Sequence, residues 1–406
     1  MIRRKQEFEM EVLVINCGSS SLKFQLINSD NEKVLAKGLC ERIGISGSAI
    51  TYESVNCEKN TKEIDMPTHN EAITAVISAL TAENTGVIKD MSEVGAVGHR
   101  VVHGGEYFSK SALVTEDVLK KIEKCNNLAP LHNPANIIGI KACMKIMKDT
   151  PNVVVFDTAF HQTMPEEAYL YALPREYYDD YKIRRYGFHG TSHSFVSKRA
   201  AAICGKPYNE LKTIVCHLGN GASICAVDGG KSVDTSMGLT PLAGVIMGTR
   251  SGDIDPGILE VIANHTGKNI SEITEILNKK SGVAGLSGVS SDFRDIEKAI
   301  SEGNENAKSA FDAYVHTVVK FIGAYVAVMN GVDVIAFTAG VGENNGHVRK
   351  DVCSHLKYLG IEIDDEANSK RGEEVMISTK ESKVKVYVIP TNEELAIARE
   401  TVEVLA

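Results

Sequence analysis

The alternation of apolar and polar residues predicts a β-hairpin near the start of the chain. Residues 12–16 read Val-Leu-Val-Ile-Asn, residues 17–21 are small and polar, and residues 22–27 alternate as Leu-Lys-Phe-Gln-Leu-Ile. Apolar runs of this length around a Gly/Ser cluster are typical of two strands joined by a turn. A related pattern returns at residues 213–227. The chain contains either two copies of one unit or two unrelated hairpins, and the pattern alone leaves both open.

Strand-like runs and helical stretches alternate along the rest of the chain, which predicts an α/β fold. The predicted strands cover residues 96–102, 153–156, 332–338 and 384–389. The predicted helices cover residues 134–147 with Asn133 as the cap, 292–300 with Ser291 as the cap, 307–329, and the segment after Asn392. The most apolar stretch, residues 318–337, contains Lys320 and Asp333. These charges favour a buried helix followed by a strand, and we expect no transmembrane segment.

Length and composition narrow the class of protein. A chain of 406 residues exceeds what one compact core supports, so we expect two domains. The formal net charge of −9 argues against a basic nucleic-acid-binding face. Nine cysteines without a C-x-x-C pair favour a reducing, cytoplasmic compartment over a disulfide framework. Residues 1–9 lack the apolar core of a signal peptide and look dispensable.

Two turns within the predicted hairpins have the chemistry of a phosphate site. Gly18-Ser-Ser-Ser21 offers backbone N–H groups and hydroxyls, and Lys23 follows as a counter-charge. Gly219-Asn-Gly221 follows His217, and its Asn-Gly pair suits a type I′ turn. Gly, Ser and Asn also dominate ordinary turns, so a purely conformational role stays open for both segments.

Two familiar nucleotide motifs are incomplete and are rejected. Gly230-Lys-Ser232 resembles the end of a P-loop, but Cys225 occupies the position of the first glycine. Gly340-Val-Gly342 begins a G-x-G-x-x-G motif that Asn345 ends. The Gly340 turn is predicted to join a strand to a helix. Its backbone could approach a nucleotide closely, or the segment could be a plain connecting loop, and both interpretations stay open.

Several segments place charged or imidazole groups at the ends of apolar runs. They are residues 98–105, 130–134, 156–161, 186–193 and 247–253. A single buried histidine is more often structural than catalytic, so we assign no catalytic role to His99, His103, His161 or His193. The chain contains no H-E-x-x-H motif and no Cys/His cluster with zinc-ligand spacing, which excludes the common zinc sites.

Together these segments resemble the acetokinase family, the acetate kinases, within the actin, sugar kinase and Hsp70 superfamily. The resemblance runs over nearly the whole chain, through residues 12–24, 95–106, 156–161, 185–193, 234–257 and 390–394. It implies two domains of a duplicated, RNase H-like α/β fold around a central cleft. The first, an acyl-kinase domain, would comprise residues 1–159 plus 395–406, and residues 160–394 would form the nucleotide-binding and dimerisation domain. A cytoplasmic homodimer without nucleic-acid or membrane partners is expected.

The resemblance also assigns roles to individual residues. The catalytic group it implies comprises Arg100 and Arg250 as phosphoryl-stabilising arginines, His189 as the transition-state histidine, and Asp157 as a catalytic carboxylate. The implied acetate site comprises Arg100, Val102, Leu131, His132, Phe188 and Pro241. The implied nucleotide site comprises Lys23, His217, Leu218, Gly219, Asn220, Gly221, Asp292, Phe293, Arg294, Gly340, Val341, Gly342, Glu343 and Asn344. Asn16 and Glu393 would bind Mg²⁺, with Mn²⁺ as a substitute.

The implied reaction is reversible transfer of the γ-phosphoryl group of ATP to acetate, which gives acetyl phosphate and ADP. Acetate is already ionised at neutral pH, so the reaction needs positioning and positive charge more than a general base. A propionate or butyrate kinase is one alternative, because one methylene changes binding by only about 1 to 3 kcal/mol. A chaperone-like ATPase of the same fold is another. The residues that depart from the family pattern, Asn345-Gly-His347, leave the choice of nucleotide donor open.

Overall fold

The computed structural model describes residues 10–406, so the interpretation of residues 1–9 as dispensable lies outside the described residues. The chain forms two compact units. Unit 1 comprises residues 10–159 together with Asn392–Ala406, and unit 2 comprises Phe160–Thr391. The segment Asn392–Glu394, which the sequence reading assigned to the second domain, packs with unit 1.

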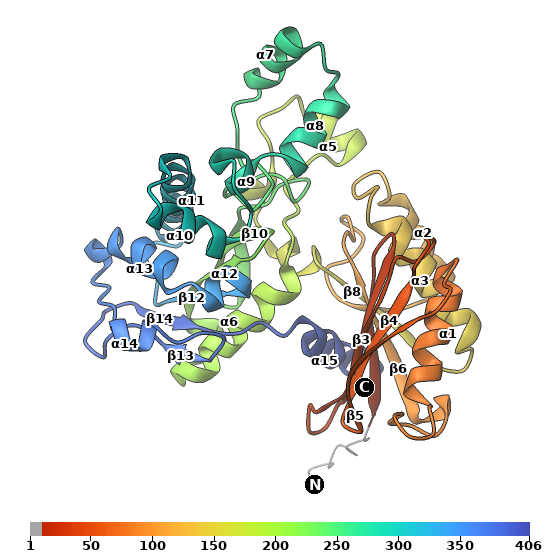
Figure 1. The fold of residues 1–406 in the computed structure, drawn as a ribbon. Coiled ribbons are helices and arrows are strands. Elements are labelled where there is room, and N and C mark those ends of the chain that lie inside the picture. Colours follow the sequence, from red (N-terminus) through yellow and green to blue (C-terminus); the bar gives the residue numbers. More distant parts are fainter. Residues whose placement is uncertain (1–9) are drawn as a thin grey trace. The chain divides into compact units, whose positions relative to one another are not determined.

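Unit 1 is an eight-stranded mixed sheet covered by helices (Figure 1). Its strands are β1 (Glu11–Cys17), β2 (Ser21–Asn28), β3 (Val34–Glu41), β4 (Ala49–Ser54), β5 (Cys57–Glu63), β6 (Val94–Val101), β7 (Ala112–Leu113) and β8 (Asn152–Phe156). Its α-helices are α1 (His69–Leu80), α2 (Glu116–Lys124), α3 (Asn133–Ile146) and α15 (Glu393–Leu405). Unit 1 is therefore closed by the most C-terminal helix of the chain.

Unit 2 is a six-stranded mixed sheet with a larger set of helices. Its strands are β9 (Lys212–Leu218), β10 (Ala222–Asp228), β11 (Lys231–Thr235), β12 (Val334–Thr338), β13 (Val375–Met376) and β14 (Lys385–Val388). Its helices are α4 (Glu166–Tyr169), α5 (Arg175–Tyr181), α6 (Gly190–Cys204), α7 (Gly257–Thr266), α8 (Ile270–Lys279), α9 (Gly282–Ser287), α10 (Phe293–Ser301), α11 (Glu305–Val328), α12 (Ala339–Asn344), α13 (Gly346–Ser354) and α14 (Asp365–Asn368).

The two sheets repeat the same five-strand core. The order β3-β2-β1-β6-β8 in unit 1 corresponds to β11-β10-β9-β12-β14 in unit 2. In both cores the first three strands of this order form antiparallel neighbouring pairs. The last two strands run parallel to each other and to the third strand of the order, which is β1 or β9. The predicted α/β class and the duplicated unit are confirmed, because the two predicted hairpins open the two copies as β1–β2 and β9–β10. The carboxyl ends of parallel strands are where open α/β sheets hold their ligands.

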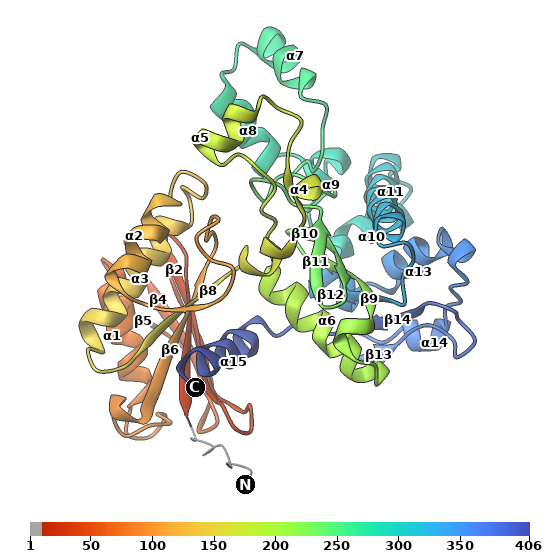
Figure 2. The same ribbon diagram turned by 180° about the vertical axis from the view of Figure 1, so that it is seen from behind.

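Strand β1 shows how the apolar pattern builds two layers of core. Leu13 and Ile15 pack into one core cluster with residues of α1 and α3, whereas Val12 and Val14 pack into another with Ile397 of α15. Successive side chains of a strand point to opposite faces, so an unbroken apolar run needs cover on both sides. Figures 1 and 2 show α15 on one face of the sheet and α1, α2 and α3 on the other.

Two predicted helix caps are wrong. Asn133 is the first residue of α3 rather than its cap, and its side chain exchanges hydrogen bonds of 3.1 and 2.9 Å with the backbone of His103. Helix α10 is capped by Asp292 instead of Ser291, since the Asp292 Oδ1 accepts a hydrogen bond of 2.9 Å from the Arg294 N–H. Asn, Ser and Asp are nearly equivalent caps, so long-range contacts decide between adjacent candidates.

Helix α11 is the one described helix with the length and hydropathy of a membrane span. Its buried side chains include Ala307, Ala310, Phe311 and Tyr314, a spacing that places them on one face. This face packs against helices and strands of unit 2, and β12 follows the helix as the sequence predicted.

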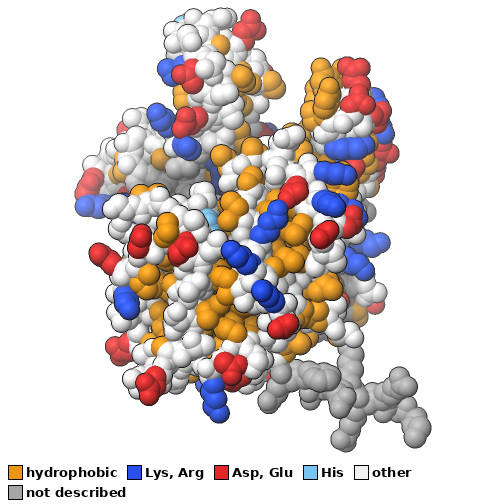
Figure 3. Space-filling model, turned by 90° about the vertical axis from the view of Figure 1, so that its right-hand side faces the viewer, with side chains coloured by type: hydrophobic (Ala, Val, Ile, Leu, Met, Phe, Trp, Pro, Cys, Tyr) orange, Lys and Arg blue, Asp and Glu red, His pale blue; other side chains and the backbone are white. Residues whose placement is uncertain are grey.

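On the face of the molecule that Figure 3 shows, basic side chains lie among acidic and hydrophobic ones.

Candidate active site

An arginine and an aspartate meet at the carboxyl ends of two parallel strands in unit 1. Arg100 lies near the end of β6, and Asp157 directly follows β8. The Arg100 guanidinium donates to both carboxylate oxygens, with Nε–Oδ1 at 3.0 Å and Nη2–Oδ2 at 2.6 Å. The Asp157 side chain is 2% exposed and that of Arg100 is 24% exposed. The nearby Asp157 raises the pKa of Arg100, so the guanidinium is a permanent cation with one partly accessible side.

Three further predicted residues lie beside this pair. Lys23 forms an ion pair with Glu394, and Asn16 is the register partner of Lys23 across the β1–β2 ladder. Burial, and to a lesser extent the neighbouring carboxylates, raises the pKa of Glu393 against the opposing effect of Arg100. These residues gather on one edge of unit 1, where Lys23 binds a carboxylate rather than standing as a free counter-charge.

The structure places the predicted acetate-site residues of unit 1 in different environments. Val102 is buried, and its N–H donates to Asn136 Oδ1 at 3.2 Å. Leu131 is 74% exposed, and His132, the N-cap of α3, is also exposed. Of the two apolar residues predicted for the acetate site in unit 1, Val102 is therefore buried and Leu131 is exposed.

In unit 2 the β9–β10 turn contains the predicted Gly219-Asn-Gly221 segment. The hairpin is confirmed, but neither Asn220 nor Gly221 has the positive φ that a type I′ turn requires, so the predicted turn type is wrong. A Cβ on Gly221 would lie 3.3 Å from Arg250 Nη1 and 3.6 Å from His189 Nε2. A cation and an imidazole therefore approach the backbone of the turn closely, and a side chain at position 221 would crowd Arg250.

Arg250 has no carboxylate partner among the described residues. Its Nη1 donates to the carbonyl oxygen of Pro241 at 3.1 Å, a neutral acceptor. Burial lowers the pKa of Arg250. Arg100 of unit 1 differs, because it is paired with Asp157. A half-buried guanidinium held at a glycine turn without a counter-ion is a strong candidate for binding an anion.

His189 has strained backbone and a fixed ring. It occupies the left-handed region at φ 57° just before α6, and its ring stacks on His217 with centroids 4.0 Å apart. The neighbouring Phe188 is buried, and its carbonyl oxygen receives a hydrogen bond of 3.0 Å from His161 Nε2. Strain of this kind in a non-glycine residue persists only where the surroundings hold it, which supports a functional position.

We expect His189→Asn to lower kcat by about 10²- to 10³-fold while KM for either substrate changes only a few-fold. The loss of one donor aimed at transition-state charge has this size and acts mainly on the chemical step. Asparagine tolerates the left-handed backbone and so leaves the loop intact. Steady-state kinetics measure the effect, with His265→Asn on the exposed α7 as the matched control. A change confined to KM would make His189 a binding residue instead.

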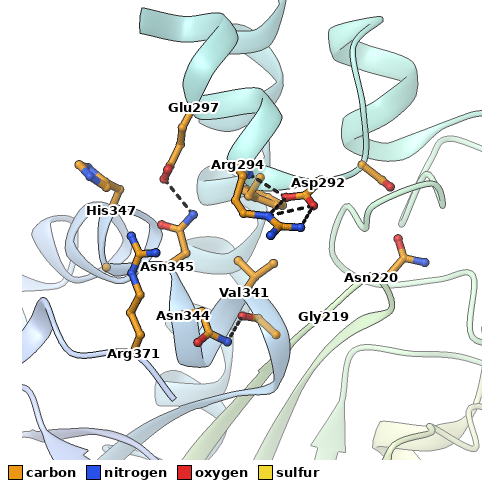
Figure 4. Close-up of a pocket in the computed structure, with 14 residues that line it drawn as sticks. Gly219, Asn220, Asp292, Arg294, Glu297, Val341, Asn344, Asn345, His347 and Arg371 are labelled. Carbon is orange, nitrogen blue, oxygen red and sulfur yellow. Dashed lines mark hydrogen bonds and ion pairs between the residues drawn. The ribbon is translucent and has the colours of Figure 1, made fainter. Parts of the chain in front are cut away.

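A pocket of about 560 Å³ adjoins the β9–β10 turn and has the size of small-ligand sites. Eight predicted nucleotide residues line it: Gly219, Asn220, Asp292, Phe293, Arg294, Gly340, Val341 and Asn344. Figure 4 shows Gly219 and Asn220 on one side and His347 with Arg371 on the opposite side. The turn that approaches Arg250 thus forms one wall of a cavity large enough for a nucleoside.

The other predicted nucleotide residues do not line this pocket. Leu218 is buried in β9, and Gly342 is buried within α12. Glu343 Oε1 accepts hydrogen bonds from the N–H groups of Ala339 at 2.7 Å and Thr391 at 3.1 Å. Glu343 therefore fixes the backbone around the pocket. Gly340 was expected in a turn, but α12 starts directly after β12 and includes it.

The sequence reading missed several residues of this site. Ser291, Glu297, Asn345, Gly346, His347 and Arg371 also line the pocket. Arg349 is fully buried, and its Nη1 donates to the carbonyl oxygens of Gly342 and Glu343 at 2.9 and 3.0 Å. Its Nη2 donates to the Lys370 carbonyl at 3.0 Å, so one guanidinium ties α12 to the segment before Arg371. No local motif marks these positions, although the Asn345-Gly-His347 departure was visible in the sequence.

The four histidines without an assigned catalytic role, His99, His103, His161 and His193, are all buried. Burial lowers the pKa of His99 and of His161 to about 4, and that of His193 well below its usual value. The unfolded chain therefore binds more protons than the folded one between about pH 6.5 and 4.

We expect the free energy of unfolding to fall as the pH drops through this window. Each such histidine contributes up to about 1.4 kcal/mol per pH unit. Urea unfolding between pH 7.5 and 4.5 measures the slope, which should flatten in His99→Gln and stay unchanged in the exposed control His265→Gln. Equal stability at pH 7 and pH 5 would contradict the prediction.

Two repeated α/β cores, a glycine-turn arginine without a carboxylate partner among residues 10–406, and an adjoining nucleoside-sized pocket are features expected of nucleotide-dependent phosphoryl-transfer proteins. The model of the acetokinase family matches residues 11–399. The acetate kinase of Agathobacter rectalis is 64% identical over 397 residues, which cover 98% of this chain and 100% of that protein. The chain belongs to the acetokinase family.

Solved structures agree with this membership. The acetate kinase of Porphyromonas gingivalis is 49% identical, with a TM-score of 0.95 over 98% of this chain and 100% of the other. A propionate kinase from Francisella tularensis is 45% identical, with a TM-score of 0.90 over 97% and 99% of the two chains.

Proposed function

We propose that the protein is an ATP:acetate phosphotransferase that reversibly transfers the γ-phosphoryl group of ATP to acetate. The observation that carries this proposal is the convergence of Arg250 and His189 on Gly221, the residue that follows Gly219 and Asn220 in the wall of the 560 Å³ pocket. With the nucleoside of ATP in the pocket, the phosphate chain would lie at this turn. Arg250 and His189 would then bind the phosphates. The relatives named acetate kinase support the same function.

The chemistry of the acceptor suits the residues of unit 1. Acetate reaches the enzyme as a carboxylate, so it needs no base to become a nucleophile. Asp157 is poorly placed to act as a base, because both of its oxygens accept hydrogen bonds from Arg100. In this proposal Asp157 orients Arg100, and Arg100 neutralises charge on acetate and the transferring phosphoryl group. Val102, Leu131, Phe188 and Pro241 would contact the methyl group, and His132 the carboxylate.

The donor set of unit 1 fits a magnesium ion delivered with the nucleotide. Among the described residues, no cluster of three or more His, Cys, Asp or Glu side chains could hold a metal by itself. Mg²⁺ commonly takes only one or two protein oxygens and completes its shell with water and phosphates. The Glu393 carboxylate and the Asn16 amide offer such oxygens on the edge where Lys23 meets Glu394. When bound, the ion would neutralise phosphate charge, and Mn²⁺ would fit the same donors.

The proposal extends to the location and the oligomeric state of the protein. We expect a cytoplasmic protein, because the cysteines described are all free thiols and most of them are buried. We also expect a homodimer formed through unit 2, as the family resemblance implied. Sedimentation of the purified protein tests the second expectation.

A propionate kinase is the second candidate, supported by the 45% identity to the Francisella tularensis enzyme. A hydrophobic site discriminates one methylene by only about 10- to 200-fold. The apolar positions Val102, Phe188 and Pro241 therefore permit either acid. An ATPase that uses no acceptor is the less favoured function. Each unit has its own arginine, Arg100 or Arg250, and two arginines suit a reaction between two anions, a carboxylate and ATP.

The test is an acceptor series. Purified protein is incubated with Mg-ATP and acetate, propionate, butyrate or no acid, and acyl phosphate is trapped with hydroxylamine while ADP is measured in parallel. We expect acid-dependent hydroxamate with the highest kcat/KM for acetate. A higher value for propionate would establish the second candidate, and ADP without hydroxamate would establish an ATPase.

A further inference from the structure

A buried hydroxyl links the candidate transition-state histidine to a second histidine. Ser223 lies on β10, and its Oγ is 2.8 Å from His189 Nδ1 and 2.7 Å from His193 Nε2. Ser223 and His193 are fully buried, so this hydroxyl has no access to bulk water. The chain of contacts therefore runs from His193 through Ser223 to His189.

The far end of this chain sets the direction of its hydrogen bonds. His193 Nδ1 is buried without a hydrogen-bond partner among the described residues. Burial lowers the pKa of His193, so the ring is neutral and carries one N–H. A buried N–H without an acceptor is rarer and more costly than a buried lone pair without a donor. The proton of His193 therefore sits on Nε2, which donates to Ser223 Oγ.

The direction then propagates to the next residue. A hydroxyl that accepts from His193 still has its own O–H to donate, and His189 Nδ1 lies within hydrogen-bond distance. If His189 Nδ1 accepts that bond, the proton of the neutral ring must be on Nε2. The ring edge formed by Nε2 and Cε1 faces the turn, since both atoms lie 3.6 Å from the position of a Cβ on Gly221.

We propose that His193 and Ser223 are positioning residues that hold neutral His189 as its Nε2–H tautomer, with a hydrogen-bond donor aimed at the Gly221 turn. This inference rests on the proposed function for its catalytic meaning. A donor beside Arg250 stabilises negative charge on a phosphoryl group, whereas the opposite tautomer would present a lone pair to that charge. The arrangement supplies a donor at any pH at which His189 is neutral.

The first test reads the tautomer directly and needs no activity. Long-range ¹H–¹⁵N correlation spectra of histidine-labelled protein at pH 8 distinguish protonated from unprotonated ring nitrogens, and His189→Gln assigns the His189 signals. We expect the Nε2–H form in the wild type and a mixture of tautomers in Ser223→Ala. Ser192→Ala is the matched control, since it removes a hydroxyl 2.8 Å from His217 Nδ1 without touching the Ser223 contact, and it should leave the His189 tautomer unchanged. The Nδ1–H form in the wild type, or a pure Nε2–H form in Ser223→Ala, would overturn the proposal.

The second test asks whether the tautomer matters for turnover. Ser223→Ala should lower kcat by about 10- to 100-fold with KM nearly constant, the usual cost of losing an orienting partner. Ser223→Thr keeps the hydroxyl on a strand position and should restore most of the rate. Equal rates for Ser223→Ala and wild type would overturn the positioning role. Absence of acyl phosphate with the wild-type enzyme, together with the expected spectra, would instead reject the proposed function and leave the tautomer assignment standing.

Discussion

Arg250→Ala is expected to lower kcat/KM by about 10³- to 10⁵-fold, the range found when an arginine that stabilises a phosphoryl-transfer transition state is removed. The structural reason is that Arg250 approaches the Gly221 turn without any carboxylate partner in the described part of the chain. Its charge is therefore available to a ligand. Steady-state kinetics with Mg-ATP and acetate measure the loss.

The stability of the Arg250→Ala protein should change little, because no buried carboxylate is left unpaired. Arg250→Lys keeps the charge but lacks the planar fork, so it should recover only a small part of the rate. The matched control is Arg199→Ala, which removes an exposed arginine paired with Glu374 on the same unit. Near-normal turnover of a folded Arg250→Ala enzyme would reject the assignment.

Arg100→Ala is expected to lose activity to a similar extent and also to unfold more easily. Asp157 is almost fully buried and would lose both hydrogen bonds of its bidentate partner. An unpaired buried charge of this kind costs about 3 to 5 kcal/mol. Chemical denaturation followed by circular dichroism measures the stability, and the hydroxamate assay measures the rate.

A double variant separates the two effects of Arg100. Arg100→Ala combined with Asp157→Ala removes the unpaired charge, so it should regain much of the lost stability while remaining inactive. Recovery of activity in the double variant would mean that Arg100 serves only to neutralise Asp157. Full stability of the single variant would contradict the predicted ion-pair energetics.

The sequence predicted the elements whose signals are local. Period-2 alternation and short apolar runs located β1, β2, β9 and β10, and the apolar periodicity located α11. Fine details depended on distant partners. Asn133 looked like a cap but binds the backbone of His103, and Gly340 looked like a loop residue but lies in a helix. Local propensity cannot anticipate a partner thirty residues away.

The same division applies to the candidate site. The segments that carry charged and imidazole groups were visible in the sequence, whereas the roles of individual residues came from the resemblance to the acetokinase family. The hydrogen-bond and ion-pair partners of each side chain could not be predicted from the sequence. Lys23 and Glu394 pair across a large separation in sequence, and Arg349 reaches carbonyl groups of two segments. No sequence motif marks Ser223, a residue within a strand, as part of the site, yet its hydroxyl contacts two histidines.

The packing of α15 on the unit 1 sheet has a consequence for synthesis. While the ribosome makes the chain, Val12, Val14, Ile27 and Val155 emerge long before Ile397 and Ala398 of α15, which pack against them in the finished protein. Unit 1 must therefore wait with an apolar face exposed, whereas unit 2 is continuous and can fold as it emerges. Glu393 arrives on the same last helix. A nascent chain cut short before Asn392 would thus lack both the cover of its first sheet and the Glu393 carboxylate of the proposed magnesium site, so α15 must be made before unit 1 can be completed.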